Sequence, residues 1–200
     1  MKEGEPRYVA HSEELTGYRV KAVRRGPFRL VGYTRIFGPN DGATPAFWDE
    51  VIADGRLARL VGASAVRPWV FGLGSWDPEC PKGGHRHTIC IEETPDVDPA
   101  RLVAARLDAA RRGAAEPLFR KEIGASDWLC FEMPRDAYPE RFWRDDPYRM
   151  LKALGYRFHT GKGDFSVGLH LDAFPPGSDV ATGPSMEFWI TVIPITLIAT

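Results

Sequence analysis

The sequence predicts an α+β fold in which two β-α-β-β units, related by a pseudo-twofold axis, form one curved antiparallel sheet with helices on one face. Three observations support this fold class. The chain has 200 residues, enough for one domain whose core needs no disulfide or metal. Strand and helix patterns follow one another twice in the same order. Short motifs also recur at a nearly constant offset: Phe47-Trp48 as Phe142-Trp143, Gly62 as Gly155, and Gly72-Leu73 as Gly168-Leu169.

The first half opens with a strand, because apolar and charged residues alternate over residues 18–37. Thr44-Pro45 then provides an N-cap followed by proline at the first helical position, and Gly62 marks the end of that helix. The Asp54-Gly55 pair is expected to break it. Residues 69–74 and 87–92 are two further strands, which we expect to form a hairpin with a long turn rich in proline and glycine.

The second half follows a connecting helix over residues 100–112, which begins after Asp98-Pro99. Residues 121–134 are predicted to form a strand with an apolar centre. A third helical stretch begins near residues 138–139, is interrupted at Asp146-Pro147 and ends at Gly155. Strands over residues 165–174 and 186–193 complete the order.

These elements predict a single domain over residues 1–200. Its halves cover residues 18–95 and 118–195, joined by a connecting segment over 98–113. Two such units packed side by side leave a concave seam between them, which is a natural place for a small-molecule cleft.

Charge and composition limit the partners. The 26 Lys and Arg residues balance 27 Asp and Glu residues, which argues against direct binding of nucleic acid. Residues 18–35 nevertheless contain only basic charged residues. This segment is either a groove for phosphates or, as we favour, a solvated strand face whose cations discourage edge pairing.

The cysteines and the termini predict a cytoplasmic protein. Cys80, Cys90 and Cys130 cannot all pair with one another, and the N-terminus has no apolar signal-peptide segment. The longest apolar stretch, residues 188–199, contains Pro194 and is too short to span a membrane.

One cluster of potential metal ligands occurs in the chain, at Cys80, His85, His87 and Cys90. Cys2His2 sets do bind structural zinc, but this spacing fits no common zinc finger, and the two histidines fall on an alternating strand. We therefore predict no metal and no other cofactor.

The order of elements resembles the GyrI-like small-molecule-binding domain, which also serves as the effector domain of AraC-type and multidrug-sensing transcription regulators. The resemblance rests on the helix end at residues 151–156, on Leu171-Asp172-Ala173-Phe174, which is similar to the Phe-Glu-x-Tyr stretch of the family, and on the final Ile193-Pro194-Ile195. It implies an aromatic cleft, often with a buried carboxylate, that accepts flat and frequently cationic compounds. Asp172 replaces the family glutamate, and the connecting helix and last strand are longer. No helix-turn-helix segment fits before the first strand, so we expect the stand-alone form.

Two strands supply the candidate polar contacts. Alternation places Glu187 on the same face of its strand as Trp189 and Thr191, where it is either the anionic floor of a pocket or the partner of an Arg or His on a neighbouring strand. His170 and Asp172 share one face of the preceding strand, where they either hold a water or lie at a solvated strand end. The complete set of predicted ligand-binding residues is Glu187, Trp189, Asp172, His170, Phe174, Trp76, Tyr33, Phe37 and Trp143.

The preferred hypothesis is a multidrug- or xenobiotic-binding protein that takes planar hydrophobic or cationic aromatic molecules into this cleft, for sequestration or sensing. The resemblance also implies an enzymatic alternative, the hydrolysis of cyclopropane-bearing DNA-alkylating natural products. In that case Glu187 is the catalytic residue that activates a water. A third hypothesis is interaction with a protein partner, a topoisomerase or a regulator.

Overall fold

The computed structural model describes residues 4–39, 41–111, 118–134, 140–161, 164, 168–178, 180 and 186–195. Ten strands and six helices occur in this part of the chain. In chain order they are β1 (Arg7–Tyr8), α1 (Ser12–Thr16), β2 (Val20–Arg25), β3 (Phe28–Phe37), α2 (Thr44–Ala53), α3 (Arg56–Val61), β4 (Val70–Ser75), β5 (His85–Glu92), α4 (Pro99–Arg111), β6 (Phe119–Ile123), β7 (Ser126–Glu132), α5 (Glu140–Arg144), α6 (Pro147–Ala153), β8 (Tyr156–Phe158), β9 (His170–Phe174) and β10 (Glu187–Pro194).

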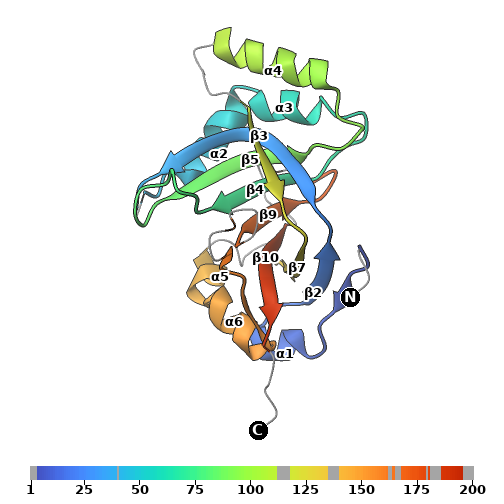
Figure 1. Cartoon of the computed structure of the whole chain (residues 1–200), viewed down its shortest axis with the longest axis vertical. Coiled ribbons are helices and arrows are strands. Elements are labelled where there is room, and N and C mark those ends of the chain that lie inside the picture. The colour runs from blue at the N-terminus through green and yellow to red at the C-terminus, as the bar shows by residue number, and fades with distance from the viewer. Residues whose placement is uncertain are drawn as a thin grey trace.

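The strands form one curved antiparallel sheet in the order β1-β2-β7-β10-β9-β4-β5-β3-β6, with β8 paired to β10 (Figure 1). The order is nearly symmetric about the β4–β9 pair, since β7-β10-β9 lies on one side and β4-β5-β3 on the other. The predicted fold class is confirmed. We call the β4–β9 pair the seam; Gly72 lies opposite Asp172 at its middle.

The first strand of each half pairs with the other half. β2 leads directly into β3 but pairs with β7, whereas β6 leads into β7 but pairs with β3. The turns are at Gly26-Pro27 and Gly124-Ala125. Our expectation of one continuous strand over residues 18–37, and of another over 121–134, is therefore wrong. In the first of these turns Pro27 has no N–H to donate to a strand ladder, which accounts for the break between β2 and β3.

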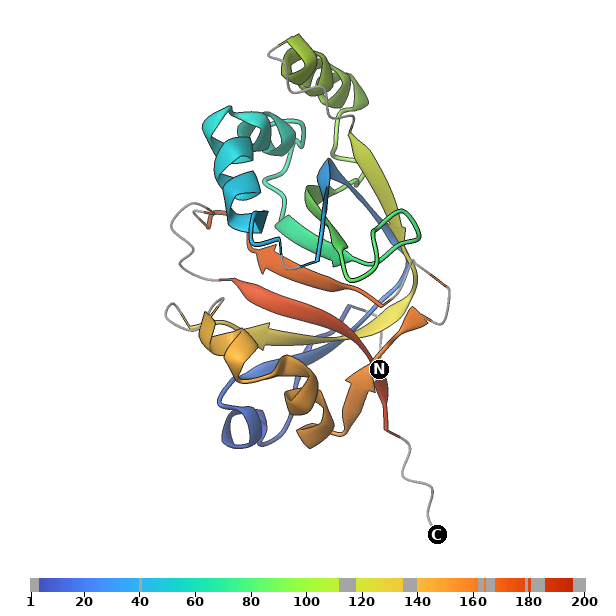
Figure 2. The same ribbon diagram turned by 90° about the vertical axis from the view of Figure 1, so that its left-hand side faces the viewer.

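The sheet separates two hydrophobic cores. On one side, which we call the helix face, α2 and α3 pack over the first half and α5 and α6 over the second, with β9 and β10 between the two pairs (Figure 2). Phe47 of α2 and Phe142 of α5 are both fully buried there. The opposite side, the far face, holds a second core that includes Phe71, Trp128 and Trp189. The helix α4 packs against α3.

The helix breaks follow from the sequence. Gly55 adopts a φ of 76° between α2 and α3, as the Asp54-Gly55 pair predicts. Asp146 accepts a hydrogen bond from the backbone N–H of Arg149 at the start of α6. Residues 112, 138–139 and 165–167 of the predicted elements lie outside the described residues. Sequence analysis did not predict β1, α1 or β8.

Two of the three repeated motifs keep their places. Phe47-Trp48 and Phe142-Trp143 both lie in the first helix of their half, and Gly62 and Gly155 both follow the second. The third pair is out of register, because Gly72 lies in the middle of β4 whereas Gly168 precedes β9. Strand register therefore identifies Gly72 and Asp172, rather than two glycines, as the central pair of the seam.

Candidate functional site

Two glycines make room on the helix face of the seam. Gly72 and Gly74 of β4 pair with Asp172 and His170 of β9. A Cβ on Gly72 would lie 2.9 Å from Asp172 Oδ2 and 2.9 Å from Trp48 Cζ2, and one on Gly74 would lie 2.1 Å from His170 Nε2. The absence of side chains at these two positions lets the β9 side chains and Trp48 lie over β4.

One tryptophan from each half reaches the seam. Trp48 of α2 packs its ring against Phe174, with centroids 5.5 Å apart, and donates its indole N–H to His87 Nε2 at 3.0 Å. Trp143 of α5 packs against His170 at 5.9 Å and against Phe188 at 5.3 Å. The two rings thus come from equivalent places in the repeat and approach the seam from opposite sides.

Three aromatic side chains are unusually exposed beside these groups. Trp76, immediately after β4, is 42% exposed, and Trp143 and Tyr148 are each 38% exposed. Trp76 contacts His170 at 5.2 Å and Phe158 at 6.4 Å, and Tyr148 contacts Phe158 at 5.5 Å. We call Trp76, Trp143 and Tyr148 the aromatic patch. Exposed apolar side chains that cluster in this way are typical of a binding site, whereas single exposed ones need no explanation.

The ionisable side chains at the seam are one carboxylate and two imidazoles. Burial lowers the pKa of His87 to about 3, and burial lowers that of His170 to about 4, so both rings are neutral at pH 7. Asp172 is 7% exposed and is the acidic residue of the two seam strands. A carboxylate among aromatic rings favours a cation over an anion or a neutral molecule.

Glu187 and Trp189 do not belong to this arrangement. The register pairs Glu187 with Ala173 and Trp189 with Leu171, so both side chains lie on the far face, across the sheet from Asp172. Glu187 accepts hydrogen bonds from Lys21 Nζ and from the Trp189 indole, each at 2.7 Å. It is the partner of a cation two strands away, and the hydrolytic alternative gains no support from this geometry.

Tyr33 and Phe37 lie on the helix face but away from the seam. Tyr33 is fully buried beneath Arg56, whose guanidinium carbon is 5.4 Å from the ring centroid. Phe37 packs against Phe47 and His85. Both residues are core.

The structure therefore brings five of the nine predicted residues together and adds three that were not predicted to bind ligand. The five are Asp172, His170, Phe174, Trp76 and Trp143; the three are Trp48, His87 and Phe188. Trp48 was recognisable in the sequence, because it is the repeat equivalent of Trp143.

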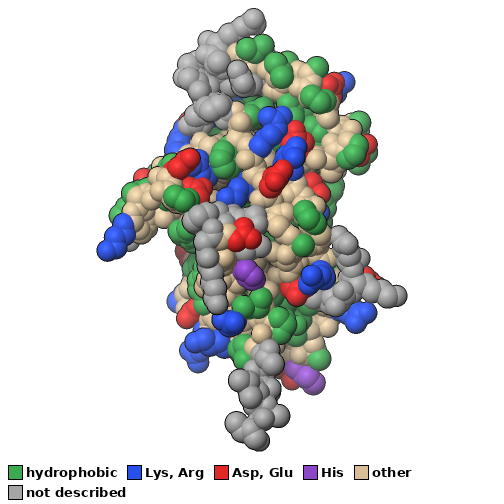
Figure 3. All heavy atoms as spheres, viewed as in Figure 1, with side chains coloured by type: hydrophobic (Ala, Val, Ile, Leu, Met, Phe, Trp, Pro, Cys, Tyr) green, Lys and Arg blue, Asp and Glu red, His purple; other side chains and the backbone are tan. Residues whose placement is uncertain are grey.

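The basic segment of β2 and β3 forms ion pairs rather than a phosphate groove. Acidic and basic side chains also lie interspersed on the face of the molecule drawn in Figure 3. These pairs include Arg19–Glu132, Lys21–Glu132, Lys21–Glu187, Arg24–Asp127, Arg25–Glu92, Arg29–Glu93, Arg29–Glu122 and Arg35–Glu50.

The potential metal ligands of the β4–β5 hairpin are dispersed. The Cys80 thiol donates to Asp77, and the Cys90 thiol donates to the Phe71 carbonyl. His87 and Cys90 point to opposite faces of β5, since they are an odd number of residues apart. Within the described ranges no three His, Cys, Asp or Glu side chains gather as a metal site. None of the helices in those ranges is long and apolar enough to cross a membrane.

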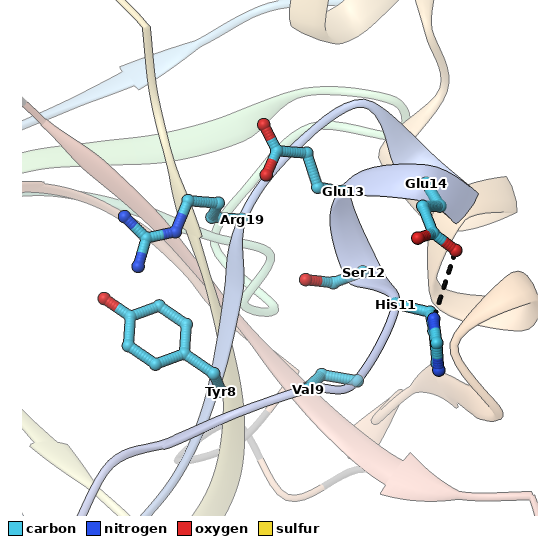
Figure 4. Close-up of a pocket in the computed structure, with 7 residues that line it drawn as sticks. All are labelled: Tyr8, Val9, His11, Ser12, Glu13, Glu14 and Arg19. Atoms are coloured by element: carbon cyan, nitrogen blue, oxygen red, sulfur yellow. Dashed lines mark hydrogen bonds and ion pairs between the residues drawn. The ribbon is translucent and has the colours of Figure 1, made fainter.

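An open surface hollow occurs elsewhere, between β1 and α1 (Figure 4). Its wall includes the charged side chains of Glu13, Glu14 and Arg19, and His11 hydrogen-bonds Glu14 at 3.1 Å. It contains no residue of the seam, so we do not regard it as the ligand site. Its lining residues are Tyr8, Val9, His11, Ser12, Glu13, Glu14 and Arg19.

Comparison with known proteins shows a similarity of fold. No protein-family model matches the chain, and no curated protein matches it in sequence. Among solved structures, SAV2435 bound to tetraphenylphosphonium superposes with a TM-score of 0.58 at 14% identity, covering 88% of this chain and 93% of that one.

Two further structures have the same architecture. A putative transcription regulation protein from Staphylococcus aureus MU50 gives a TM-score of 0.51 at 13% identity, over 88% of this chain and 97% of its own. An integron cassette protein from Vibrio cholerae gives 0.50 at 9% identity, over 87% and 95%.

Proposed function

We propose that this protein is a GyrI-like small-molecule-binding protein that takes planar hydrophobic or cationic aromatic compounds at the seam, for sequestration or sensing. The observation that carries the proposal is the aromatic patch beside Asp172. Three exposed rings are linked through His170 and Phe158, and His170 lies on the same strand as Asp172, the one carboxylate of the seam strands.

The forces available at this site match such a ligand. Stacked or edge-to-face ring contacts contribute about 0.5–1.5 kcal/mol each beyond the burial of area, and a cation over a desolvated ring about 2 kcal/mol. Asp172 places a carboxylate beside these rings, and the neighbouring His87 and His170 are neutral. A flat cation gains from ring stacking, from cation–π contacts and from the carboxylate, whereas an anion is repelled by the carboxylate.

The structural neighbours support this choice. One of them was solved with tetraphenylphosphonium, a cation that carries four phenyl rings, and another is described as a putative transcription regulator. The bound ligand and the regulatory role are properties of the neighbouring proteins. The ligand site proposed for this protein is argued from its own side chains.

Titration with methylene blue, a planar phenothiazinium cation, tests the proposal. Quenching of tryptophan fluorescence should give a saturable 1:1 isotherm with the mass of the dye unchanged. Trp48→Leu and Trp143→Leu should each weaken binding about tenfold, the equivalent of 1.4 kcal/mol.

Two carboxylates on opposite faces of the sheet provide the matched pair of variants. Asp172→Asn should weaken binding of methylene blue about tenfold or more, whereas Glu187→Gln, which removes a carboxylate from the far face, should change it less than twofold. Absence of saturable binding, or an equal loss in both variants, would overturn the proposal.

A further inference from the structure

His170 is enclosed by aromatic rings on the helix face of the seam. Its imidazole stacks on Phe188 with centroids 5.3 Å apart and planes at 26°, and it meets Trp76 and Trp143 edge-on at 5.2 and 5.9 Å. Across the seam, Gly74 leaves room for the Nε2 atom. A phenylalanine ring at this position could make the same packing contacts. Packing therefore does not explain why the side chain carries two ring nitrogens.

The Nδ1 atom of His170 is buried and has no hydrogen-bond partner among the described residues. A buried polar atom without a partner destabilises the folded state, and native proteins keep such atoms rarely. The neighbouring His87 shows the contrast, because its Nε2 accepts the Trp48 indole N–H at 3.0 Å. The Nδ1 atom of His170 therefore retains a hydrogen-bonding capacity that none of the described residues uses.

The neighbourhood decides which kind of partner fits. A neutral imidazole offers one donor and one acceptor nitrogen. Asp172 projects from the same face of β9, two residues along the strand, and the oxygens of a carboxylate accept hydrogen bonds. A ligand atom that donates an N–H suits the acceptor nitrogen of His170, whereas an electron-rich acceptor atom on the ligand would face the nearby carboxylate and be disfavoured.

We infer that His170 is a specificity-determining residue that accepts a hydrogen bond from the bound ligand, so that the site prefers aromatic cations with primary or secondary amino groups over equally flat cations whose nitrogens are fully alkylated. The inference rests on the proposed function and refines its ligand class. Tetraphenylphosphonium, the ligand of the structural neighbour, has no N–H group and lies outside the preferred class.

Thionine and methylene blue form a matched pair of probes, because both are phenothiazinium cations and differ in carrying amino or dimethylamino groups. The wild-type protein should bind thionine about five- to tenfold more tightly, which is the range of one net hydrogen bond. His170→Leu should reduce that preference to below twofold. His170→Asn, which restores an acceptor oxygen on a short side chain, should retain part of it.

His85→Leu is the control, since it removes an imidazole that stacks on Phe37 outside the seam, and the thionine preference should persist. Urea unfolding of each variant establishes that it is folded at the titration temperature. Equal affinity of the wild type for both dyes, or an unchanged preference in both His170 variants, would overturn the inference while the proposed function stands. Failure of both dyes to bind would overturn the proposed function and this inference with it.

Discussion

Gly72 of β4 and Asp172 of β9 lie opposite one another at the centre of the sheet, and the carboxylate occupies the space that a side chain on the glycine would fill. Trp48 and His87 approach the same point, since Trp48 Cζ2 and His87 Nε2 would lie 2.9 and 3.1 Å from a Cβ on Gly72. The position of the acidic group therefore depends on the smallest residue of the neighbouring strand.

The Gly72→Ala variant should therefore disturb the side chains that pack on β4 at the seam. The new methyl group would displace Asp172 or Trp48, and overpacking of this kind lowers the free energy of unfolding by about 1–3 kcal/mol. We expect methylene blue affinity to fall about tenfold, measured together with urea unfolding. Gly42→Ala is the control, because nothing lies within 4 Å of its Cβ position; an equal effect of both changes would contradict the prediction.

The Trp76→Ala variant should lose dye affinity while the protein remains folded. The side chain is already 42% exposed, so its truncation should lower the free energy of unfolding by less than the loss of about 3–5 kcal/mol that is typical of removing a fully buried Phe or Trp side chain. Dye affinity should nevertheless fall about tenfold, because the indole forms one wall beside His170. Val66→Ala, at a side chain that is 61% exposed away from the aromatic patch, should change neither quantity. A stability loss without an affinity loss would remove Trp76 from the site.

Acid should destabilise the protein through His87. Burial lowers its pKa from 6.5 to about 3, so below pH 6.5 the unfolded chain takes up a proton that the folded protein does not. The free energy of unfolding should therefore decrease as pH falls from 6.5, by about 1.4 kcal/mol per pH unit for this residue. His170, whose pKa burial lowers to about 4, acts in the same direction but less strongly.

Urea denaturation between pH 7.0 and 5.5 measures this dependence before most carboxylates titrate. His87→Gln keeps an acceptor for the Trp48 indole and should flatten the slope. An unchanged slope in that variant would show that other groups cause the acid sensitivity.

The cysteines should differ in reactivity. Burial raises the pKa of the Cys90 and Cys130 thiols far above the ordinary value, and both side chains are buried. Cys80 is half-buried, and burial raises its pKa as well. A thiol reagent at pH 8 should modify one cysteine slowly in the folded protein and three in urea. Cys80→Ser should abolish the native-state reaction; modification of two thiols before unfolding would contradict the structure.

The sequence predicts the architecture well because its evidence is local. Proline and glycine mark the helix ends near Thr44, Gly62 and Gly155, and apolar alternation identifies the main strands. The strands that sequence analysis missed, β1 and β8, have only two and three residues, too few to show alternation.

The site is harder to predict because it depends on pairing between distant strands. Alternation correctly groups Glu187 with Trp189, and His170 with Asp172, but it does not say which face of one strand continues into which face of the next. That information lies in the register, which places Phe188 rather than Glu187 beside Asp172. The partner of Glu187, Lys21, lies on β2, on the other side of β7.

The crossing of β2 and β6 between the halves also shapes how the chain must fold. Val20 pairs with Phe131 and Phe28 with Ile123, so neither half completes its hydrogen-bonding ladder until the other has been synthesised. Such distant contacts make folding slow, because the entropy of closing long loops is lost before the strands gain their partners. A fragment that contains only one half would leave the strand that pairs with the other half without a partner. Because an unpaired strand edge promotes association between chains, we expect either half alone to aggregate rather than to fold.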